Sequence, residues 1–376
     1  MNITSAFDSG NIQVVEARDP QQIRLRMVDD AHTEKHQWFH FALHGAAGQA
    51  CRLLLENAGS AAYVDGWQDY QAVASYDRES WFRVPTRFDD SGLIIEHTPE
   101  ADLVYYAYFA PYPSERHRDL IAQAQCDDRV QYHCLGQSPD GQSLDLLQIG
   151  ELEDGKKVCW IIARQHPGET MAQWWMEGCL DTLLDDTNAI SLALRQRCVF
   201  LLVPNMNPDG SRRGHLRHNA LGVDLNRAWR QPSAETSPEV FHVLERMSQT
   251  GVDFFLDVHG DEALPYNFIA GSEGIPGWDA RQQAQLDGYK QALKAATPEF
   301  QTEHGYPVDP PGEANLDIGS NFIGHRFGCL SMTLEMPFKD NADLPNPLVG
   351  WSPERAAALA GPCLQALWEG LEQNRI

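Results

Sequence analysis

Two residues able to bind a metal ion lie three positions apart in the middle of the chain. They are His166 and Glu169, within the turn-rich segment 163–170. An imidazole nitrogen and a carboxylate oxygen are both ligands of catalytic zinc, and a tight turn allows both to reach one ion. Such a zinc takes three protein ligands, so a third residue must come from elsewhere. The alternative is that both are ordinary loop residues, with Glu169 placing negative charge at a helix N-terminus.

The residues that flank this segment predict a strand followed by a turn and a helix. Residues 158–163 form a short, continuous apolar run, which is typical of a buried strand. From Thr170 to Leu184, apolar residues recur at helical spacing. His166 and Glu169 are therefore predicted to lie at the carboxyl end of a strand.

Three further strand-like runs also end beside polar residues. They are 198–203 before Asn205, 253–258 before His259, and 329–334 before Glu335. In open α/β sheets, sites form where the carboxyl ends of parallel strands converge. If these strands are parallel, their polar residues share one edge of the sheet with His166 and Glu169. His259 is then the candidate for the third metal ligand.

Two histidines and one carboxylate would leave one zinc position open for water, as in hydrolytic rather than structural sites. Zinc lowers the pKa of its bound water to about 7 and polarises a carbonyl group. A further carboxylate must then take the proton of the water and deliver it to the leaving amine. Glu335 is the candidate for this general acid/base. The alternative is that Glu335 closes a strand in a solvated loop.

Residues 212–227 carry an unusual number of arginines for so acidic a chain. Arg217 and Arg227 are candidates for binding two anions, the oxyanion that develops at the attacked carbonyl and a fixed carboxylate of the substrate. A guanidinium suits both because its planar fork binds paired oxygens and stays charged. Asn226 adds a neutral amide to the same clamp. A carboxylate held beside the bond that breaks belongs to the C-terminal residue of a peptide, whereas surface ion pairs are the alternative for both arginines.

The length of 376 residues suggests two domains. Residues 1–115 contain short, often alternating strand signals separated by turn residues, which predicts an all-β sandwich. Residues 116–376 alternate strands with helices, which predicts an α/β domain with a central mixed, largely parallel sheet.

Charge and composition exclude several classes of partner. The net charge of -24 and the pI near 4.8 argue against nucleic acid or an anionic membrane surface as a partner. The sequence shows no secretory signal and no apolar segment long enough to cross a bilayer. The eight cysteines are dispersed without CxxC pairs, as expected for reduced thiols in a cytoplasmic protein.

Four histidines, His32, His36, His40 and His44, recur every four residues in the first domain. This spacing invites comparison with a metal site. Because His40 and His44 fall in a run that alternates like a strand, we expect a solvated strand face instead.

Five segments, taken together, resemble the zinc metallocarboxypeptidases in order and approximate spacing. These segments are His166–Glu169, Asn205–Gly210, Gly222–Arg227, Asp257–His259 and Thr333–Glu335. More narrowly, the chain resembles the cytosolic carboxypeptidase branch, whose eukaryotic members remove glutamates from protein C-termini and side chains. That branch carries a β-sandwich domain ahead of the catalytic domain. Four segments here look like signature pieces of that first domain: Phe7–Asn11, Gln37–Phe41, Trp81–Arg83 and Tyr108–Pro113.

The resemblance implies a role for each candidate residue. It implies that His166, Glu169 and His259 bind one zinc ion, that Glu335 is the general acid/base, that Arg217 stabilises the oxyanion, and that Asn226 and Arg227 hold the terminal carboxylate. The implied substrate is a peptide or protein C-terminal tail, and acidic residues are the leading expectation for what is released.

Three features differ from the family pattern or lie in its variable parts. Gly260–Glu262 replaces residues that are serine or histidine in many relatives. Tyr306 lies in the region where pancreatic relatives have a tyrosine that folds over the substrate. His325 and Arg326 are candidates for favouring an acidic side chain, with a structural ion pair as the alternative.

Two other functions remain open at this point. An amidohydrolase or deacylase could use the same zinc site on small acyl-amino acids. A binding protein could retain the fold and a relic of the metal site, although the presence of Glu335 with all the other chemical residues argues against that possibility.

Overall fold

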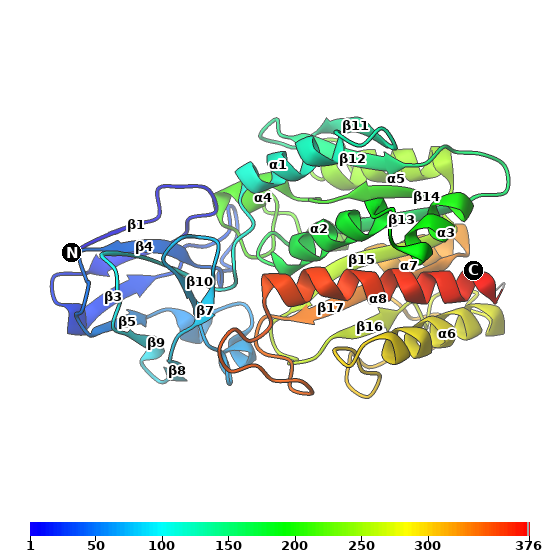
Figure 1. Ribbon diagram of the computed structural model, residues 1–376. Coiled ribbons are helices and arrows are strands. Elements are labelled where there is room, and N and C mark those ends of the chain that lie inside the picture. The colour runs from blue at the N-terminus through cyan, green and yellow to red at the C-terminus, as the bar shows by residue number, and fades with distance from the viewer. Residues whose placement is uncertain (374–375) are drawn as a thin grey trace.

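The first part of the chain is built from two β-sheets. The computed structural model describes residues 1–373 and residue 376, and Figure 1 shows the β part on the left, in blue and cyan. One sheet has the order β1 (Asn2–Thr4), β4 (His40–His44), β10 (Leu103–Ala107), β6 (Val73–Ser75) and β7 (Phe82–Arg83). The other has the order β2 (Gln13–Glu16), β3 (Ile23–Arg26), β5 (Cys51–Leu55), β9 (Gly92–His97) and β8 (Thr86–Asp89).

Both sheets bury one shared apolar core, and their strands alternate as a half-buried strand should. In β5, Cys51, Leu53 and Leu55 are buried, while the residues between them are partly exposed. All pairs of strands are antiparallel except β3 with β5. Three short helical turns complete this part: η1 (Pro20–Gln22), η2 (Ala58–Ser60) and η3 (Val64–Trp67). The prediction of a first domain made of β-sheets is confirmed.

The second part contains a seven-stranded mixed sheet. Its order is β11 (Val130–Gln137), β12 (Ser143–Ile149), β14 (Cys198–Val203), β13 (Lys157–Ala163), β15 (Phe254–Asp261), β17 (Leu330–Pro337) and β16 (Phe268–Gly271). The four strands β14, β13, β15 and β17 are parallel, and the strands at both edges are antiparallel. The predicted α/β architecture with parallel central strands is confirmed.

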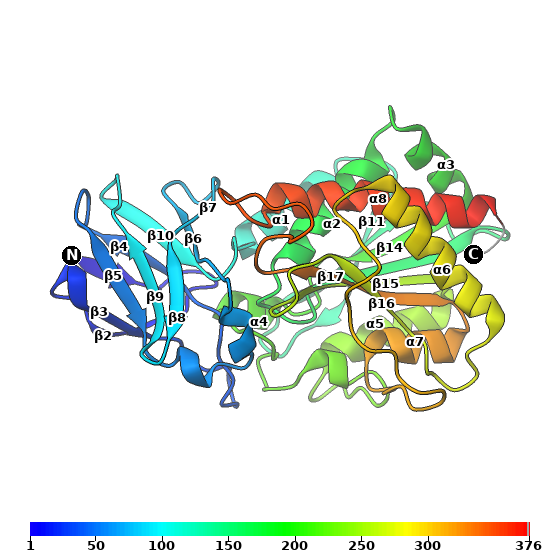
Figure 2. The ribbon, with the colours of Figure 1, turned by 90° about the horizontal axis from the view of Figure 1, so that it is seen from below.

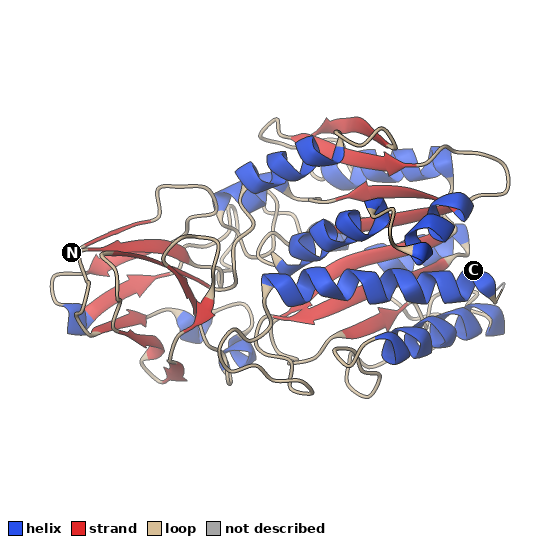
Figure 3. Ribbon diagram, in the orientation of Figure 1, coloured by secondary structure: helices blue, strands red, loops and turns tan. Residues whose placement is uncertain are grey.

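Helices cover both faces of this sheet (Figures 2 and 3). One face carries α2 (Met171–Leu184), α3 (Ala189–Arg197), α6 (Ala280–Ala296) and α8 (Pro353–Glu372), and the other carries α5 (Pro238–Thr250) and α7 (Gly319–Phe327). The remaining helical segments are α1 (Ser114–Ala124), α4 (Pro208–Arg213) and η4 (Leu225–Arg227). Strand β13 shows why two layers are needed. Cys159 and Ile161 pack in the core under α2 and α8, whereas Trp160 and Ile162 pack in the core under α5.

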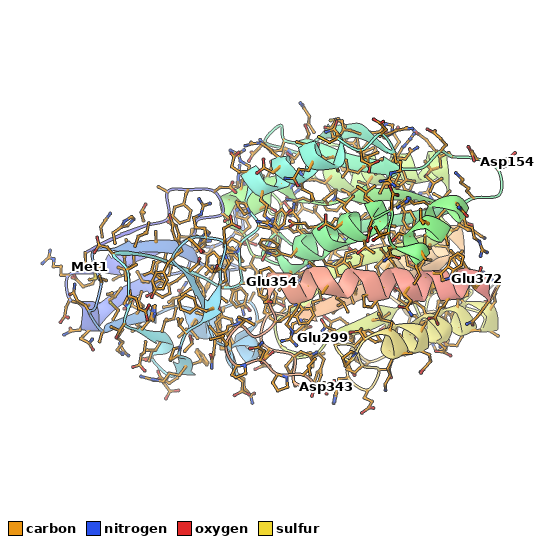
Figure 4. All side chains as sticks on the ribbon, in the orientation of Figure 1. Met1, Asp154, Glu299, Asp343, Glu354 and Glu372 are labelled. Atoms are coloured by element: carbon orange, nitrogen blue, oxygen red, sulfur yellow. The ribbon has the colours of Figure 1, made fainter. Side chains whose placement is uncertain are left out.

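The two parts are joined by a polar and apolar interface. Helix α8 runs from Glu354, beside the β part, to Glu372 at the far end of the molecule (Figure 4). The Arg83 guanidinium of β7 donates from Nη2 to the carbonyl oxygens of Phe338 at 2.9 Å and Trp351 at 3.1 Å. The Tyr108 ring stacks on the Phe338 ring with centroids 4.5 Å apart. A partly buried cation that binds carbonyl groups of the other part fixes the two parts relative to each other.

Two structural details differ from the sequence prediction. Strands β15 and β17 continue past the predicted ends, so that His259 and Glu335 lie inside strands rather than after them. The expectation of a solvated histidine face is wrong, because His40 is buried and hydrogen-bonds to Ser9 Oγ at 3.0 Å, and His36 is buried as well. Burial lowers the pKa of His40 to about 3.

Two further observations concern the whole chain. All eight cysteines are free thiols, six of them buried. Among the described residues, no helix has both the length and the hydropathy needed to cross a bilayer.

Candidate active site

His166, Glu169 and His259 converge at the carboxyl edge of the central strands. One possible ligand atom from each residue lies within 4.8 Å of the others. The Glu169 carboxylate lies between the two imidazoles, with Oε1 2.6 Å from His166 Nδ1 and Oε2 2.8 Å from His259 Nδ1. The two Nδ1 atoms are 3.2 Å apart. All three side chains are buried, so these donors point at one small volume rather than at solvent.

The turn that presents His166 and Glu169 is held from several sides. Arg164, directly after β13, has a positive φ of 60°, and its buried guanidinium donates from Nε to Pro167 O at 3.0 Å. Gly168 donates from its backbone N–H to Leu216 O at 2.8 Å, and a side chain there would come within 2.9 Å of that oxygen. A left-handed residue and a glycine without room for a side chain let the chain reverse tightly enough for both ligands to face inward.

Each histidine has a carboxylate behind it. Nε2 of His166 lies 3.2 Å from Asp224 Oδ1, and Nε2 of His259 lies 2.9 Å from Asp257 Oδ1. Carboxylates behind metal-binding imidazoles fix the tautomer so that the other ring nitrogen presents its lone pair to the ion. Here both inward nitrogens are Nδ1, the atoms nearest Glu169. The residues present therefore fit a catalytic metal ion.

Sequence reasoning did not single out Asp224 or Asp257. Asp257 is fully buried in β15, and its Oδ2 accepts a hydrogen bond of 2.5 Å from Gln165 Nε2. The Gln165 carbonyl oxygen Oε1 in turn accepts from Trp229 Nε1 at 2.8 Å. A signal was available, because an aspartate in an apolar strand two residues before a histidine shares its face.

The pKa of the Glu169 carboxyl is set by burial and by the two imidazoles beside it. Burial raises the pKa of the Glu169 carboxyl, but the neighbouring His166 and His259 reverse this effect, so that the net shift is downward. Glu169 is therefore held in its ionised form, which is the form that binds a cation.

Glu335 faces this cluster from the neighbouring strand. The β15–β17 register pairs His259 with Glu335, so their side chains lie beside each other on one face of the sheet. Glu335 is buried, and its Oε2 has no hydrogen-bond partner among the described residues. Burial, reinforced by Glu169, Asp261 and Glu262, raises the pKa of the Glu335 carboxyl well above its ordinary value. A carboxyl with these properties can accept and return a proton near neutral pH.

Arg217 is fixed on two edges of its guanidinium. Its Nε donates to Asp224 Oδ2 at 2.7 Å, and its Nη1 donates to Tyr63 Oη at 2.6 Å. Asp224 therefore links Arg217 to the outer nitrogen of His166. The Arg217 side chain is placed beside the ligand cluster and is mostly shielded from solvent.

Asn226 and Arg227 lie in η4, which Asp224 caps by accepting from the Asn226 N–H at 3.0 Å. The Asn226 Oδ1 atom accepts from the Gly319 N–H at 2.8 Å, which orients its amide nitrogen away from that contact. Arg227 is exposed. These two residues can present an amide and a guanidinium to one carboxylate.

A cavity of about 400 Å³ brings the candidates together. Six of the seven predicted site residues line it, and His259 lies behind them in contact with Glu169: the six are His166, Glu169, Arg217, Asn226, Arg227 and Glu335. Tyr306 lines the same cavity, and its hydroxyl donates to Asp261 Oδ2 at 2.6 Å. The divergent residues Gly260, Asp261 and Glu262 also line it.

His325 and Arg326, the residues considered for reading the released side chain, lie away from the cavity. His325 Nδ1 hydrogen-bonds to Pro276 O at 3.0 Å, and Arg326 Nη2 donates to Ser248 Oγ at 2.9 Å. Two other charged residues, Lys290 of α6 and Glu273, line the cavity as a pair with Nζ and Oε1 3.6 Å apart. Sequence reasoning missed this pair because neither residue belongs to a recognisable motif.

Comparison with known protein families matches both parts of the chain. The family described as "Zinc carboxypeptidase" matches residues 120–347, and the one described as "Cytosolic carboxypeptidase N-terminal domain" matches residues 3–109.

Individual proteins are similar over most or all of the chain. An uncharacterized protein of Zymomonas mobilis is 50% identical over 373 residues, covering 99% of this chain and 97% of that protein. The cytosolic carboxypeptidase 6 of Mus musculus is 27% identical over 300 residues, which are 72% of this chain but 55% of that protein.

Solved structures are similar across the whole chain as well. The metallo-carboxypeptidase of Pseudomonas aeruginosa in complex with (2-guanidinoethylmercapto)succinic acid is 45% identical, with a TM-score of 0.97 over 99% of this chain and 100% of that one. The metallo-carboxypeptidase of Burkholderia cenocepacia is 48% identical, with a TM-score of 0.96 over 99% of both chains.

Proposed function

The chain belongs to the zinc carboxypeptidase family, and on that basis we propose that it removes the C-terminal residue of peptides or protein tails. The observation that supports this most directly is the meeting of three potential metal ligands, a buried carboxyl and two arginines at one cavity. Hydrolysis of a terminal peptide bond needs a group that transfers protons, a site for a metal ion, and groups that bind negative charge.

We assign one zinc ion to His166, Glu169 and His259. The donor set, two imidazoles and a carboxylate, is that of catalytic zinc sites, and Asp224 and Asp257 stand behind the imidazoles. Zinc bound there would supply a nucleophilic water at neutral pH and polarise the carbonyl of the bond to be broken.

The roles of the other residues follow from their positions. Glu335 would take the proton of the attacking water and return it to the leaving amine, a role that its raised pKa and free Oε2 support. Arg217 would donate to the carbonyl oxygen as negative charge develops on it. Asn226 and Arg227 would hold the terminal carboxylate of the substrate.

For the released residue, we propose a preference for acidic side chains, with Lys290 as the residue that receives the side-chain carboxylate. Lys290 is a basic residue of the cavity wall outside the arginine clamp. Glu273, 3.6 Å away, opposes this attraction and would instead attract a basic side chain. The similar Pseudomonas aeruginosa protein was solved in complex with a compound that carries two carboxylates and a guanidinium. Such a compound has one kind of charge that suits a lysine and another that suits a glutamate.

The basic activity is tested by incubating purified, zinc-loaded protein with blocked dipeptides and with acylated amino acids. A carboxypeptidase should release the C-terminal residue at rates that depend on the penultimate residue. The same blocked dipeptide with an amidated C-terminus is the matched control and should not be cleaved, because it offers no carboxylate to Asn226 and Arg227. Hydrolysis that favours acyl-amino acids and ignores the penultimate residue would indicate a deacylase instead.

The side-chain preference is tested with peptides that differ only in a C-terminal Glu, Leu or Arg. We expect Glu to be released fastest, and Lys290→Met to lower kcat/KM for Glu by about tenfold while leaving Leu within about twofold. Faster release of Arg, lost in Glu273→Gln, would show that Glu273 and not Lys290 reads the side chain.

The cysteines support a reducing compartment as the place of action. All eight are free, and two of them, Cys126 and Cys134, are exposed. Exposed free thiols are characteristic of proteins that work where thiols are kept reduced, and we therefore propose a cytoplasmic location.

A further inference from the structure

The loop that carries Arg217 is bound by the β part of the molecule. The Asp30 carboxylate, 2% exposed, accepts hydrogen bonds from the backbone N–H groups of Leu216 at 2.6 Å, Arg217 at 2.8 Å and His218 at 3.0 Å. It also contacts His218 Nδ1 at 2.9 Å. A buried carboxylate with four such contacts is satisfied only while this loop is in place, so Asp30 fixes the loop backbone.

Other residues of the β part bind the same loop. Asn11 donates from Nδ2 to Gly214 O at 2.7 Å, and the Ala31 N–H donates to His215 Nε2 at 3.2 Å. The loop therefore runs along the β part for several residues before it reaches Arg217.

The β part also reaches the Arg217 side chain through Tyr63. The Tyr63 hydroxyl accepts the hydrogen bond from Arg217 Nη1 at 2.6 Å, and Tyr63 lines the cavity. Gln37 holds the Tyr63 backbone on both sides. Its Oε1 accepts from the Tyr63 N–H at 2.8 Å, and its Nε2 donates to the Tyr63 backbone carbonyl oxygen at 3.0 Å. Three residues later, Gly66 approaches Glu262 so closely that a side chain at Gly66 would meet the Glu262 carbonyl oxygen at 3.1 Å. Tyr63 is thus a fixed part of the cavity wall.

These contacts leave one nitrogen of the Arg217 guanidinium, Nη2, available to the substrate. Asp224 occupies Nε and Tyr63 occupies Nη1, whereas Nη2 makes no hydrogen bond to any residue that the structure describes. A guanidinium tied on two edges keeps one orientation, and a preorganised donor stabilises developing charge better than one that must first be oriented.

We propose that the β part belongs to the catalytic site, with Asp30 and Tyr63 as positioning residues that hold the backbone and the guanidinium of Arg217. This inference rests on the proposed carboxypeptidase function. It requires that removing the Tyr63 hydroxyl weakens stabilisation of the transition state and leaves substrate binding almost unchanged.

The test compares Tyr63→Phe with Tyr106→Phe, measuring kcat, KM and thermal unfolding. Tyr106 is a matched control, because its hydroxyl hydrogen-bonds to His97 Nδ1 at 2.9 Å within the β part and it does not line the cavity. We expect Tyr63→Phe to lower kcat by about ten- to hundredfold, the range for losing a hydrogen bond to a charged group, with KM within about twofold. Tyr106→Phe should retain the kcat of the unmodified protein, and both variants should stay folded.

A double-variant experiment shows whether Tyr63 acts through Arg217. In an Arg217→Ala background, Tyr63→Phe should cause no further loss of kcat, because the group that it positions is absent. An equal loss in both backgrounds would mean that Tyr63 touches the substrate directly, and an unchanged kcat in the single variant would mean that it has no role. Either result overturns the proposal.

A binding measurement separates this inference from the proposed function. A dipeptide analogue with a phosphonate in place of the scissile amide carries the negative charge that Arg217 is proposed to meet. Calorimetry should show weaker binding of this analogue to Tyr63→Phe by about tenfold or more, even if no peptide is hydrolysed. Unmodified protein that hydrolyses no peptide refutes the proposed function, whereas equal binding of the analogue to both proteins refutes the role of Tyr63.

Discussion

Replacing Asp257 by asparagine should weaken zinc binding without unfolding the protein. Asp257 is fully buried, with Oδ1 2.9 Å from His259 Nε2 and Oδ2 2.5 Å from Gln165 Nε2. Asparagine has the same shape but only one acceptor oxygen. This oxygen can face His259 or Gln165, and the amide nitrogen must then face the nitrogen of the other side chain.

Two estimates of the effect agree. Replacing a carboxylate behind a metal-binding histidine lowers metal affinity by about 10- to 100-fold in known sites. Losing the close carboxylate–imidazole contact, taken at the value of a hydrogen bond to a charged group, costs about 1.5–3 kcal/mol, which corresponds to about the same range. We therefore expect the zinc dissociation constant of Asp257→Asn to rise by about one to two orders of magnitude.

The measurement is a competition titration of metal-free protein against a chromophoric zinc chelator, with the metal content after dialysis as a second readout. Asp145→Asn is the control, because Asp145 Oδ2 lies 2.8 Å from His117 Nε2 in a similar carboxylate–imidazole pair that does not line the cavity. Zinc affinity of Asp257→Asn within about twofold of the unmodified protein would refute the reasoning. So would an equal loss in Asp145→Asn, since the effect would then not depend on His259.

Two other predictions concern catalysis and stability. Glu335→Gln should lower kcat by roughly 10²–10⁴-fold, the usual contribution of a general acid/base, while zinc content measured by atomic spectroscopy stays at one per chain. Retention of activity would exclude Glu335 from proton transfer. Burial raises the pKa of Glu239, a residue of α5, from 4.5 to about 7. The folded state therefore binds this proton more tightly than the unfolded state does. The protein loses stability as the pH rises from about 4.5 to 7. Glu239→Gln should therefore stabilise the protein by about 3 kcal/mol at pH 8 and hardly at all at pH 4.5, as measured by urea unfolding, and a gain that does not depend on pH would contradict this assignment.

Residues at the ends of buried strands were the most predictable part of the site. Apolar runs locate such strands, and the carboxyl ends of parallel strands must meet at one edge, so His166, Glu169, His259 and Glu335 could be grouped before their distances were known. The strand ends themselves were misplaced. His259 and Glu335 interrupt the apolar pattern because their side chains face the ligand cluster, although the backbone pairing of β15 and β17 continues beyond them.

The predictions that failed depended on which neighbours cover a surface. The strand pattern around His40 is compatible with an exposed face, but the rings of Phe7, Trp81 and Tyr105 pack around His40. In the same way, the position of His325 in the sequence suits the specificity pocket, but α7 buries Ser320 and Ile323 and leaves His325 outside. Local sequence defines the element and its periodicity, whereas the element packed on it decides what each face does.

The contacts of Asp30 and Tyr63 lie beyond any local pattern, because they join residues 186 and 154 positions apart in the sequence. They also determine which experiment can reveal the role of the β part. Deleting that part would leave three backbone N–H groups of the 216–218 loop without the Asp30 carboxylate, and it would expose the buried surface around Phe338. Loss of activity would then follow from disorder of the loop alone. Replacing one hydroxyl leaves Asp30, the interface and the loop backbone intact. A loss of kcat in that variant can therefore be assigned to the orientation of the Arg217 guanidinium.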